Sequence, residues 1–196
     1  MPPEANVHPQ YQAALAEIGR RIAASLRDVP PIALPIRMYI AGGTALHFYT
    51  GERVSNDVDA AFSHRIALPE DLEVSYADAD GAARLLYFDR NYNDTLGLLH
   101  EDAYDHSQPI ILPGVDARVL DVRLLSPLDL AVRKLGRFAS QDRDDIASLA
   151  LHGLIDAGQL RQRAEQALGG YIGDIARLRN SIDIACRMIG PAPEPT

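Results

Sequence analysis

Residues 38–62 combine a strand, a glycine pair, a short helix and a second strand, and few folds accommodate this order. The apolar run Ile36–Ala41 predicts a short buried strand that leads directly into Gly42-Gly43. The pattern of residues 44–50 is helical, and Gly51 is the expected C-terminal stop. Unsatisfied N–H groups at such a helix start favour a phosphate, and glycine lets it approach the backbone. The segment therefore predicts a phosphate-binding turn.

Two aspartates follow on the next predicted strand, which runs from Val54 to Phe62. Asp57 and Asp59 are two residues apart, so strand geometry places both carboxylates on one face and Val58 in the core. Adjacent carboxylates are hard oxygen ligands suited to Mg²⁺ or Mn²⁺, and such an ion also binds the phosphates of a substrate. We therefore expect both carboxylates to face a cleft close to the glycine pair.

The Asp-x-Asp pattern alone carries little information, because it occurs three times in this chain. The pair Asp78/Asp80 lies in a polar segment typical of an exposed turn. The pair Asp142/Asp144 lies near the start of a predicted helix, where acidic residues suit the helix dipole. Only the first pair lies on an alternating strand that follows a strand, a glycine turn and a helix, and this combination favours a functional site.

The remaining pattern predicts a mixed N-terminal part and a helical C-terminal part. Apolar residues at steps of three and four predict an amphipathic helix over residues 10–27. Residues 63–125 have the pattern of an antiparallel sheet with long loops. Ser126-Pro127 is a typical helix start, and a second helix is expected over residues 142–153. The expected strands after Phe62 are Leu72–Tyr76, Arg84–Phe88, Thr95–His100, Pro109–Leu112 and Ala117–Leu125.

The fold class predicted from this layout is α/β (α+β), a mixed sheet with flanking helices. Residues 1–125 form the expected core with an N-terminal helix, residues 126–190 the helical portion packed on it, and residues 191–196 a frayed tail. With 47% hydrophobic residues among 196, the chain can bury a real core.

Composition also argues against several functional classes. A net charge of -8 is unlike that of a sequence-independent nucleic-acid binder, which carries a basic face. The single cysteine, Cys186, excludes an internal disulfide and follows a helical apolar pattern, so we expect it in the core. No segment approaches the roughly 20 apolar residues of a membrane helix, and the first ten residues do not form a signal peptide. We expect a cytoplasmic protein without a membrane partner.

With these residues in place, the sequence resembles the nucleotidyltransferase superfamily, whose signature is Gly-Gly or Gly-Ser, a short helix, and Asp-x-Asp on a strand. The similarity is closest to the AbiEii-like branch, which includes toxin components of bacterial toxin–antitoxin systems. Residues 126–155 are similar to a later block of that branch. The resemblance covers roughly residues 36–170.

The resemblance implies a role for each residue of the signature. Gly42, Gly43 and Thr44 would contact the triphosphate of a nucleoside triphosphate, and Asp57 and Asp59 would bind Mg²⁺ or Mn²⁺. The implied reaction transfers a nucleoside monophosphate to an acceptor hydroxyl on a tRNA, a protein or a small molecule. The resemblance also implies a toxin role, with a cognate antitoxin as partner. The alternatives are a catalytically inactive nucleotide-binding or regulatory module, and an interaction protein whose aspartates form a solvated face.

The later block adds two residues to the implied site. Lys134 would offset phosphate charge, and Asp145 would orient the phosphate or the acceptor; otherwise the lysine is a solvated surface residue and the aspartate part of a charged helix start. Many members of the superfamily carry a third carboxylate on a neighbouring strand, for which Asp94 and Asp121 are both candidates. Histidines and acidic residues at 100–106 could be metal ligands, but such a loop is more often a polar surface.

Overall fold

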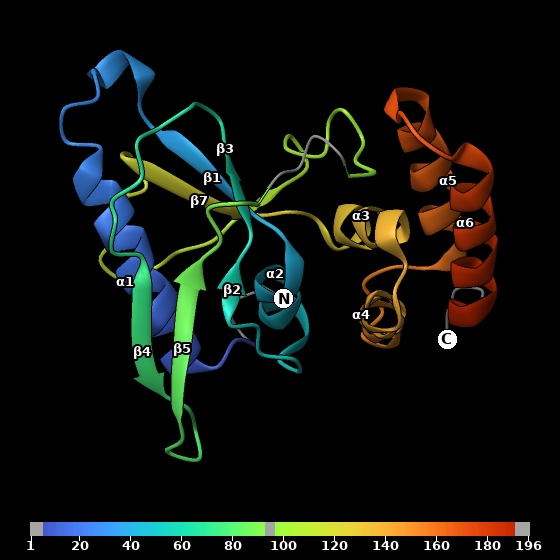
Figure 1. Ribbon diagram of the computed structural model, residues 1–196, viewed down its shortest axis with the longest axis horizontal. Coiled ribbons are helices and arrows are strands. Elements are labelled where there is room, and N and C mark those ends of the chain that lie inside the picture. Colours follow the sequence, from blue (N-terminus) through green and yellow to red (C-terminus); the bar gives the residue numbers. More distant parts are fainter. Residues whose placement is uncertain (1–5, 93–96, 191–196) are drawn as a thin grey trace. The chain divides into compact units, whose positions relative to one another are not determined.

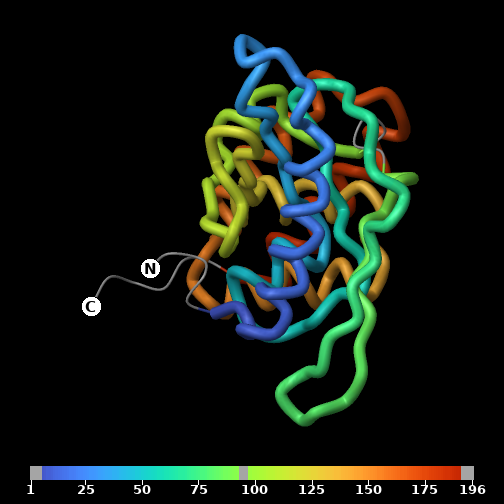
Figure 2. Tube along the Cα trace, turned by 90° about the vertical axis from the view of Figure 1, so that its left-hand side faces the viewer, coloured from blue at the N-terminus to red at the C-terminus, as the bar shows by residue number. Residues whose placement is uncertain are grey.

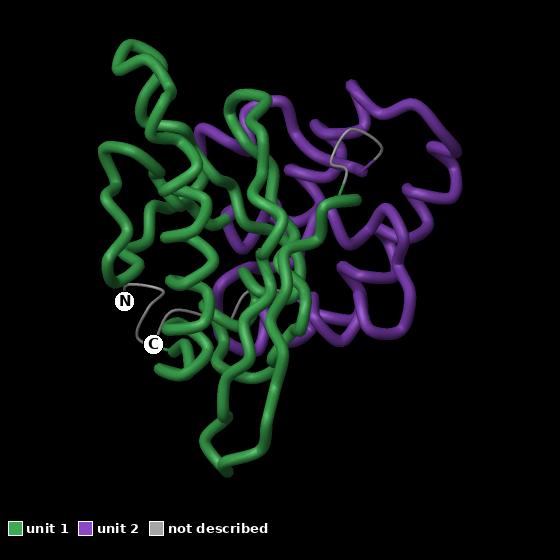
Figure 3. Tube along the Cα trace, turned by 60° about the vertical axis from the view of Figure 1, so that its left-hand side comes forward, with its two compact units in different colours: residues 1–92, 107–124 green, residues 93–106, 125–196 purple. Residues whose placement is uncertain are grey.

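A computed structural model describes residues 6–92 and 97–190 of the chain (Figure 1). Two compact units are present, drawn in green and purple in Figure 3. The first unit contains the described residues up to Tyr92 together with Ser107–Leu124, and the second contains residues 97–106 and those from Leu125 onward. The chain therefore enters the second unit, returns to the first for one segment, and ends in the second.

The first unit is built around helix α1 (Pro9–Ser25) and two small sheets. Proline in the first turn of α1 suits a helix start, because its missing N–H has no partner there in any helix. Tyr11, Leu15, Ile18 and Ile22 form one fully buried stripe, which confirms the helix predicted over residues 10–27. After α1 the chain passes through the short 3₁₀ helix η2 (Pro31–Ala33).

The first sheet has the strand order β3-β1-β7-β6. Strand β1 pairs antiparallel with β3 and parallel with β7, and β6 pairs antiparallel with β7. Burial alternates along β7, where residues 120, 122 and 124 are buried, so one face of this strand packs into the core. The strands are β1 (Ile36–Ile40), β3 (Ala60–Phe62), β6 (Gln108–Pro109) and β7 (Leu120–Leu124).

The second sheet has the order β2-β5-β4, with β2 (Asp57–Val58), β5 (Ala83–Phe88) and β4 (Glu73–Ala77). Strands β2 and β5 are parallel, whereas β4 and β5 form an antiparallel hairpin. The turn of this hairpin extends past the N-terminal end of α1, which Figure 2 shows most clearly. The α+β fold class predicted from the sequence is confirmed.

Several strand predictions are wrong in detail. The single strand expected over Val54–Phe62 is two strands, because the chain leaves one sheet at Asp59 and joins the other. Residues 63–125 do not form one antiparallel sheet, since β2–β5 and β1–β7 are both parallel. The expected strand Thr95–His100 lies partly outside the described residues, and residues 97–100 are not in a strand. In place of the strand expected over Pro109–Leu112, only Gln108 and Pro109 pair with β7.

Four α-helices make up most of the second unit: α3 (Pro127–Arg137), α4 (Ser140–Leu151), α5 (Ala157–Ala167) and α6 (Ile175–Ile189), with the 3₁₀ helix η3 (Leu168–Gly170). The Ser126 hydroxyl caps α3 by accepting from the Asp129 N–H at 3.0 Å, as the sequence predicts. Helix α4 begins two residues earlier than predicted, because the Asp142 carboxylate accepts from the Ala139 N–H. Cys186 is buried on α6, as expected. None of the described helices is long and apolar enough to cross a membrane.

A buried histidine connects the first unit's N-terminal segment to helix α2 (Gly42–Thr50). His47 is fully buried on α2 and its Nε2 accepts from the His8 backbone N–H at 3.3 Å. The rings of His8 and Tyr11 pack edge-on against it, with centroids at 4.6 and 4.9 Å. Burial, with a smaller effect of the His8 charge, lowers the pKa of His47 to about 4. The folded state therefore holds this ring neutral.

This burial predicts an acid-sensitive fold. Because the unfolded histidine titrates near 6.5 and the folded one near 4, the unfolded state binds a proton first as the pH falls. The contribution of His47 to stability should be fully present above pH 6.5 and fall by up to about 3 kcal/mol as the pH approaches 4. In His47→Phe the unfolding free energy should no longer fall with pH for this reason, whereas the exposed control His64→Phe should keep the same slope of unfolding free energy against pH. Denaturant unfolding at several pH values measures the slope, and identical slopes in wild type and His47→Phe would contradict the prediction.

Candidate functional site

The start of helix α2 is a glycine turn that other parts of the chain approach very closely. Gly42 has φ of 60°, and a methyl group at this position would overlap the carboxylate of Asp59. A methyl group on Gly43 would lie 2.6 Å from Arg53 Nη2 and 2.7 Å from Ser55 Oγ. Both glycines are thus required by the side chains that pack on them. This packing places a guanidinium and a carboxylate at the same helix start.

Asp57 is held by hydrogen bonds on two sides. The Ser55 hydroxyl donates to its carboxylate, and the Thr44 hydroxyl donates to its main-chain oxygen at 2.8 Å. Because that donation uses the only hydrogen of the Thr44 hydroxyl, the Tyr11 hydroxyl is the donor in the 2.7 Å contact between them. Burial raises the pKa of Tyr11 well above its usual range, so it keeps this hydrogen at neutral pH. The chain Tyr11–Thr44–Asp57 fixes β2 against α2.

Asp59 lies at the point where the chain changes sheets, between β2 and β3. Its main-chain oxygen accepts from the Ala41 N–H at 2.8 Å, and its carboxylate lies over Gly42. Both Asp57 and Asp59 are partly buried, whereas Val58 between them is fully buried. The structure therefore brings the aspartate pair and the glycine turn together at one corner of the first unit.

Sequence analysis did not single out Tyr87 on β5 or Asp89, the residue that follows β5, and the main chain of both is next to β2. Strand β2 is in parallel register with β5, with Asp57 opposite Tyr87 and Val58 opposite Phe88. The Asp89 N–H, one residue past the end of β5, donates to the Val58 oxygen at 3.1 Å. Register partners project to the same face of a sheet, so Tyr87 and Asp57 share one face. The main chain of Asp89 is thus next to the strand that begins at Asp57.

Of the two residues named from sequence for the third carboxylate, Asp121 does not take this position. Asp121 is opposite Arg37 in the β1–β7 register, about 13 Å along the strand from the Ala41 that bonds Asp59. Its carboxylate instead pairs with Arg123 at 3.1 Å and Arg37 at 3.8 Å. Asp94 lies outside the described residues. Only the pairing of distant strands reveals Asp89, since it follows a strand without any local motif.

Lys134 and Asp145 meet inside the second unit. Lys134 Nζ lies 2.5 Å from Asp145 Oδ2 and 3.9 Å from Asp142 Oδ1, and the two residues of the closer pair are 9% and 4% exposed. The interpretation of Lys134 as a solvated surface lysine is therefore wrong. Burial alone would raise the pKa of Asp142, but hydrogen bonds from Arg137 and the Ala139 N–H, with nearby positive charge, hold it below its usual range. This is a compact buried charge cluster on α3 and α4.

The histidine-rich segment at 100–106 belongs to a second charge network of the same unit. Arg163 Nη2 lies 2.6 Å from Asp102 and 3.0 Å from His106 Nδ1, while its Nε donates to Asp129 at 2.8 Å. Hydrogen bonding to Arg163 holds the pKa of Asp102 below its usual range. The Arg163 guanidinium thus pairs with Asp102 and Asp129 and contacts His106. Across residues 6–92 and 97–190, no three acidic, histidine or cysteine residues gather into a metal-binding cluster.

The α+β fold, the glycine turn and the adjacent aspartates define a protein of the nucleotidyltransferase class. A family model described as "Nucleotidyltransferase of unknown function (DUF6036)" matches residues 20–180, and the chain belongs to this family. The superfamily resemblance drawn from the sequence is confirmed, while the AbiEii-like branch stays a prediction. None of the curated proteins matches the chain.

A methyl group at Gly42 would overlap Asp59, so a glycine-to-alanine substitution tests the importance of this packing. Gly42→Ala should lose about 1 to 2 kcal/mol from its positive φ alone and should also displace the Asp59 carboxylate. Gly153→Ala is the control, because Gly153 has φ of 66° and nothing within 4 Å of the added methyl group. Both variants should unfold more readily, but only Gly42→Ala should also lose Mg-nucleotide binding in calorimetric titration. Equal nucleotide affinity in the two variants would refute a role for this packing.

The buried pair on α3 and α4 predicts strong non-additivity. Lys134→Met leaves the Asp145 carboxylate buried beside an apolar group, which should cost about 3 kcal/mol or more of unfolding free energy. The double variant Lys134→Met/Asp145→Leu should recover most of this loss, because neither charge remains. Arg118→Met, which breaks an exposed pair with Asp116, should leave the unfolding free energy almost unchanged. Denaturant unfolding measures all three, and additive losses would count against a coupled buried pair.

Proposed function

We propose that the chain transfers a nucleoside monophosphate from a nucleoside triphosphate to an acceptor hydroxyl. The observation that carries this proposal is the packing of the Asp59 carboxylate directly on the glycine turn at the start of α2, with Asp57 two residues before it. Carboxylate oxygens and the unsatisfied N–H groups of a helix start then serve the same substrate, a metal-bound triphosphate.

The donor set at this corner fits a magnesium or manganese ion. Asp57 and Asp59 offer hard carboxylate oxygens, one of which accepts from Ser55, and Asp89, bonded to β2 through its main chain, adds a third acid. Asp57 and Asp59 would hold the ion, which when bound supplies positive charge that neutralises the phosphates. The glycine turn would bind phosphate oxygens through its backbone N–H groups. Since the Thr44 side chain is fully buried, its contribution would come from its backbone.

The transfer can be written with every bond assigned. The acceptor hydroxyl oxygen forms a bond to the α-phosphorus, and the bond from that phosphorus to the bridging oxygen of pyrophosphate breaks. Pyrophosphate leaves with the electron pair. We propose that Asp89 takes the proton of the acceptor hydroxyl, because its main chain bonds that of Val58, between the two aspartates that position the phosphate. Arg53, packed over Gly43, adds positive charge on the same side of the turn.

Two residues of the second unit have roles that the resemblance to the nucleotidyltransferases implies. We propose that Lys134 offsets phosphate charge and that Asp145 orients its ammonium group. The support is the family match over residues 20–180 and the 2.5 Å contact between the two side chains. A tRNA, a protein and a small molecule are all acceptors within this proposal. A toxin function with a cognate antitoxin is a further proposal that rests on the AbiEii-like resemblance.

A nucleotide-binding module without turnover is the second candidate function. One observation favours it: within the described parts of the chain, Asp57, Asp59 and Asp89 are not gathered into a ready metal-binding cluster. Such a module would bind a nucleoside triphosphate but release no pyrophosphate. Pyrophosphate release in the presence of cell-extract RNA and protein therefore separates the two functions.

Three isosteric substitutions test the proposed roles. Asp57→Asn and Asp59→Asn should each abolish metal-dependent nucleotide binding in calorimetric titration, because the ion loses a charged ligand. Asp89→Asn should keep nucleotide affinity within a few-fold and slow single-turnover transfer by about a hundredfold or more, the scale for losing a general base.

The matched control for these variants is Asp116→Asn, which removes an exposed carboxylate that pairs with Arg118. It should bind and transfer as wild type does. Unchanged Mg-nucleotide affinity in both Asp57→Asn and Asp59→Asn would exclude a metal role for the pair. An Asp89→Asn variant that transfers at the wild-type rate would exclude Asp89 as the base.

A further inference from the structure

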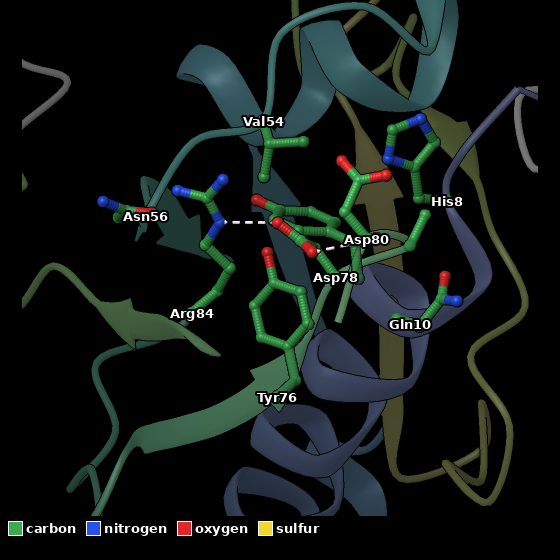
Figure 4. Close-up of a pocket in the computed structure, with 10 residues that line it drawn as sticks. His8, Gln10, Val54, Asn56, Tyr76, Asp78, Asp80 and Arg84 are labelled. Atoms are coloured by element: carbon green, nitrogen blue, oxygen red, sulfur yellow. Dashed lines mark hydrogen bonds and ion pairs between the residues drawn. The ribbon is translucent and has the colours of Figure 1, made fainter. Parts of the chain in front are cut away.

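A cavity of about 300 Å³ lies in the first unit (Figure 4). The N-terminal end of α1, the segment before β2 and the β4–β5 hairpin form its walls. Its size is at the lower end of the range for small-molecule sites. Tyr76 and Arg84 are register partners, so their side chains share one face of the sheet. Tyr87, the register partner of Asp57, is three residues after Arg84 on the same strand, so its side chain and that of Asp57 are on the other face. The cavity is therefore on the opposite face of this sheet from the aspartate pair.

Aromatic rings form much of the wall. The rings of Tyr11 and Tyr76 meet at 81° with centroids 6.1 Å apart, so they form a corner, and His8 adds a third ring. Val54 supplies an aliphatic contact, and Asn56 adds a side-chain amide. Electron-rich tyrosine faces attract cations, and the attraction increases when water is excluded.

Charges on the hairpin leave an excess of negative charge at the cavity. The Asp78 carboxylate accepts from Arg84 Nε and from the N–H groups of Asp80 and Ala82, so its charge is compensated. The Asp80 carboxylate lies on the other side of Asp78, toward His8 (Figure 4). Among the described residues, no group donates a hydrogen bond to it. The lining residues thus include two carboxylates and one guanidinium.

We propose that this cavity binds a small organic cation, an ammonium or guanidinium group carried on an apolar body. The Asp80 carboxylate would pair with the cationic group, and the partly exposed Tyr76 ring would contact both the cation and the body, whereas Tyr11 is 1% exposed and packs edge-on against that ring. Arg84 lies at the cavity and would disfavour a second cation near Asp78, so the ligand's charge is directed to the Asp80 side.

The site is connected to the aspartate pair by the hydrogen-bonded chain already described. Tyr11 lines the cavity and donates to Thr44, which donates to the main chain of Asp57. A cation bound at Tyr76 would therefore contact the ring that packs on Tyr11. The proposal does not rest on the transferase function, because binding to this cavity requires neither nucleotide nor metal.

Calorimetric titration of the whole chain, without nucleotide or metal, tests the proposal with matched probes. Benzylammonium and butylguanidinium are compared with their neutral counterparts of similar shape, benzyl alcohol and butylurea. The cations should bind saturably with a Kd of about 1 mM or tighter, and the neutral molecules about tenfold more weakly or less. Amide chemical shifts in a labelled sample should change in residues 54–56 and 76–84. Equal affinity for charged and neutral probes would overturn the proposal, as would shift changes confined to other segments.

Substitutions of the lining residues should change the affinity for cations in opposite directions. Asp80→Asn, an isosteric change in an exposed turn, should weaken cation binding about tenfold, and Tyr76→Leu should weaken it similarly. Arg84→Met removes the guanidinium among the lining residues and should strengthen it several-fold. Asp116→Asn is the control and should change nothing. Unchanged binding in Asp80→Asn, or tight binding of adenosine or guanosine with no binding of the cations, would assign the cavity to a different ligand.

Discussion

The contact between the Asp59 carboxylate and Gly42 is the constraint on which the first unit depends. It can exist only because Gly42 has no side chain and adopts a positive φ, a conformation that costs other residues about 1 to 2 kcal/mol. The same point is where the chain passes from the second sheet to the first and where Ala41 bonds Asp59. One close approach therefore fixes the helix start, the strand change and the position of a functional carboxylate together.

The second unit contains buried charges that need partners. Lys134 and Arg163 are both buried, and each has carboxylate partners within 3 Å. Burying an ion costs several kcal/mol unless a partner and hydrogen bonds compensate it, so these networks limit which arrangements of α3, α4 and α5 are stable. Asp102 and His106 in the segment 100–106 belong to this compensation through Arg163.

Family membership and site geometry are complementary in their support for a transferase. The family match establishes the class of protein but names neither substrate nor acceptor. The geometry adds two aspartates beside a helix start, with the Asp57 carboxylate accepting from Ser55 and an arginine close to Gly43.

The sequence by itself determined the local features of this protein, because they depend on neighbours within a few residues. Apolar periodicity identified α1, the Ser126 cap located α3, and Gly42-Gly43 with Asp57 and Asp59 predicted the candidate site. Only the tertiary structure decided which distant segments meet. Register between β2 and β5 revealed Asp89, the change of sheet at Asp59 divided one predicted strand, and packing of α3 on α4 buried Lys134. These depend on long-range pairing, whose energy comes from contacts that no local pattern contains.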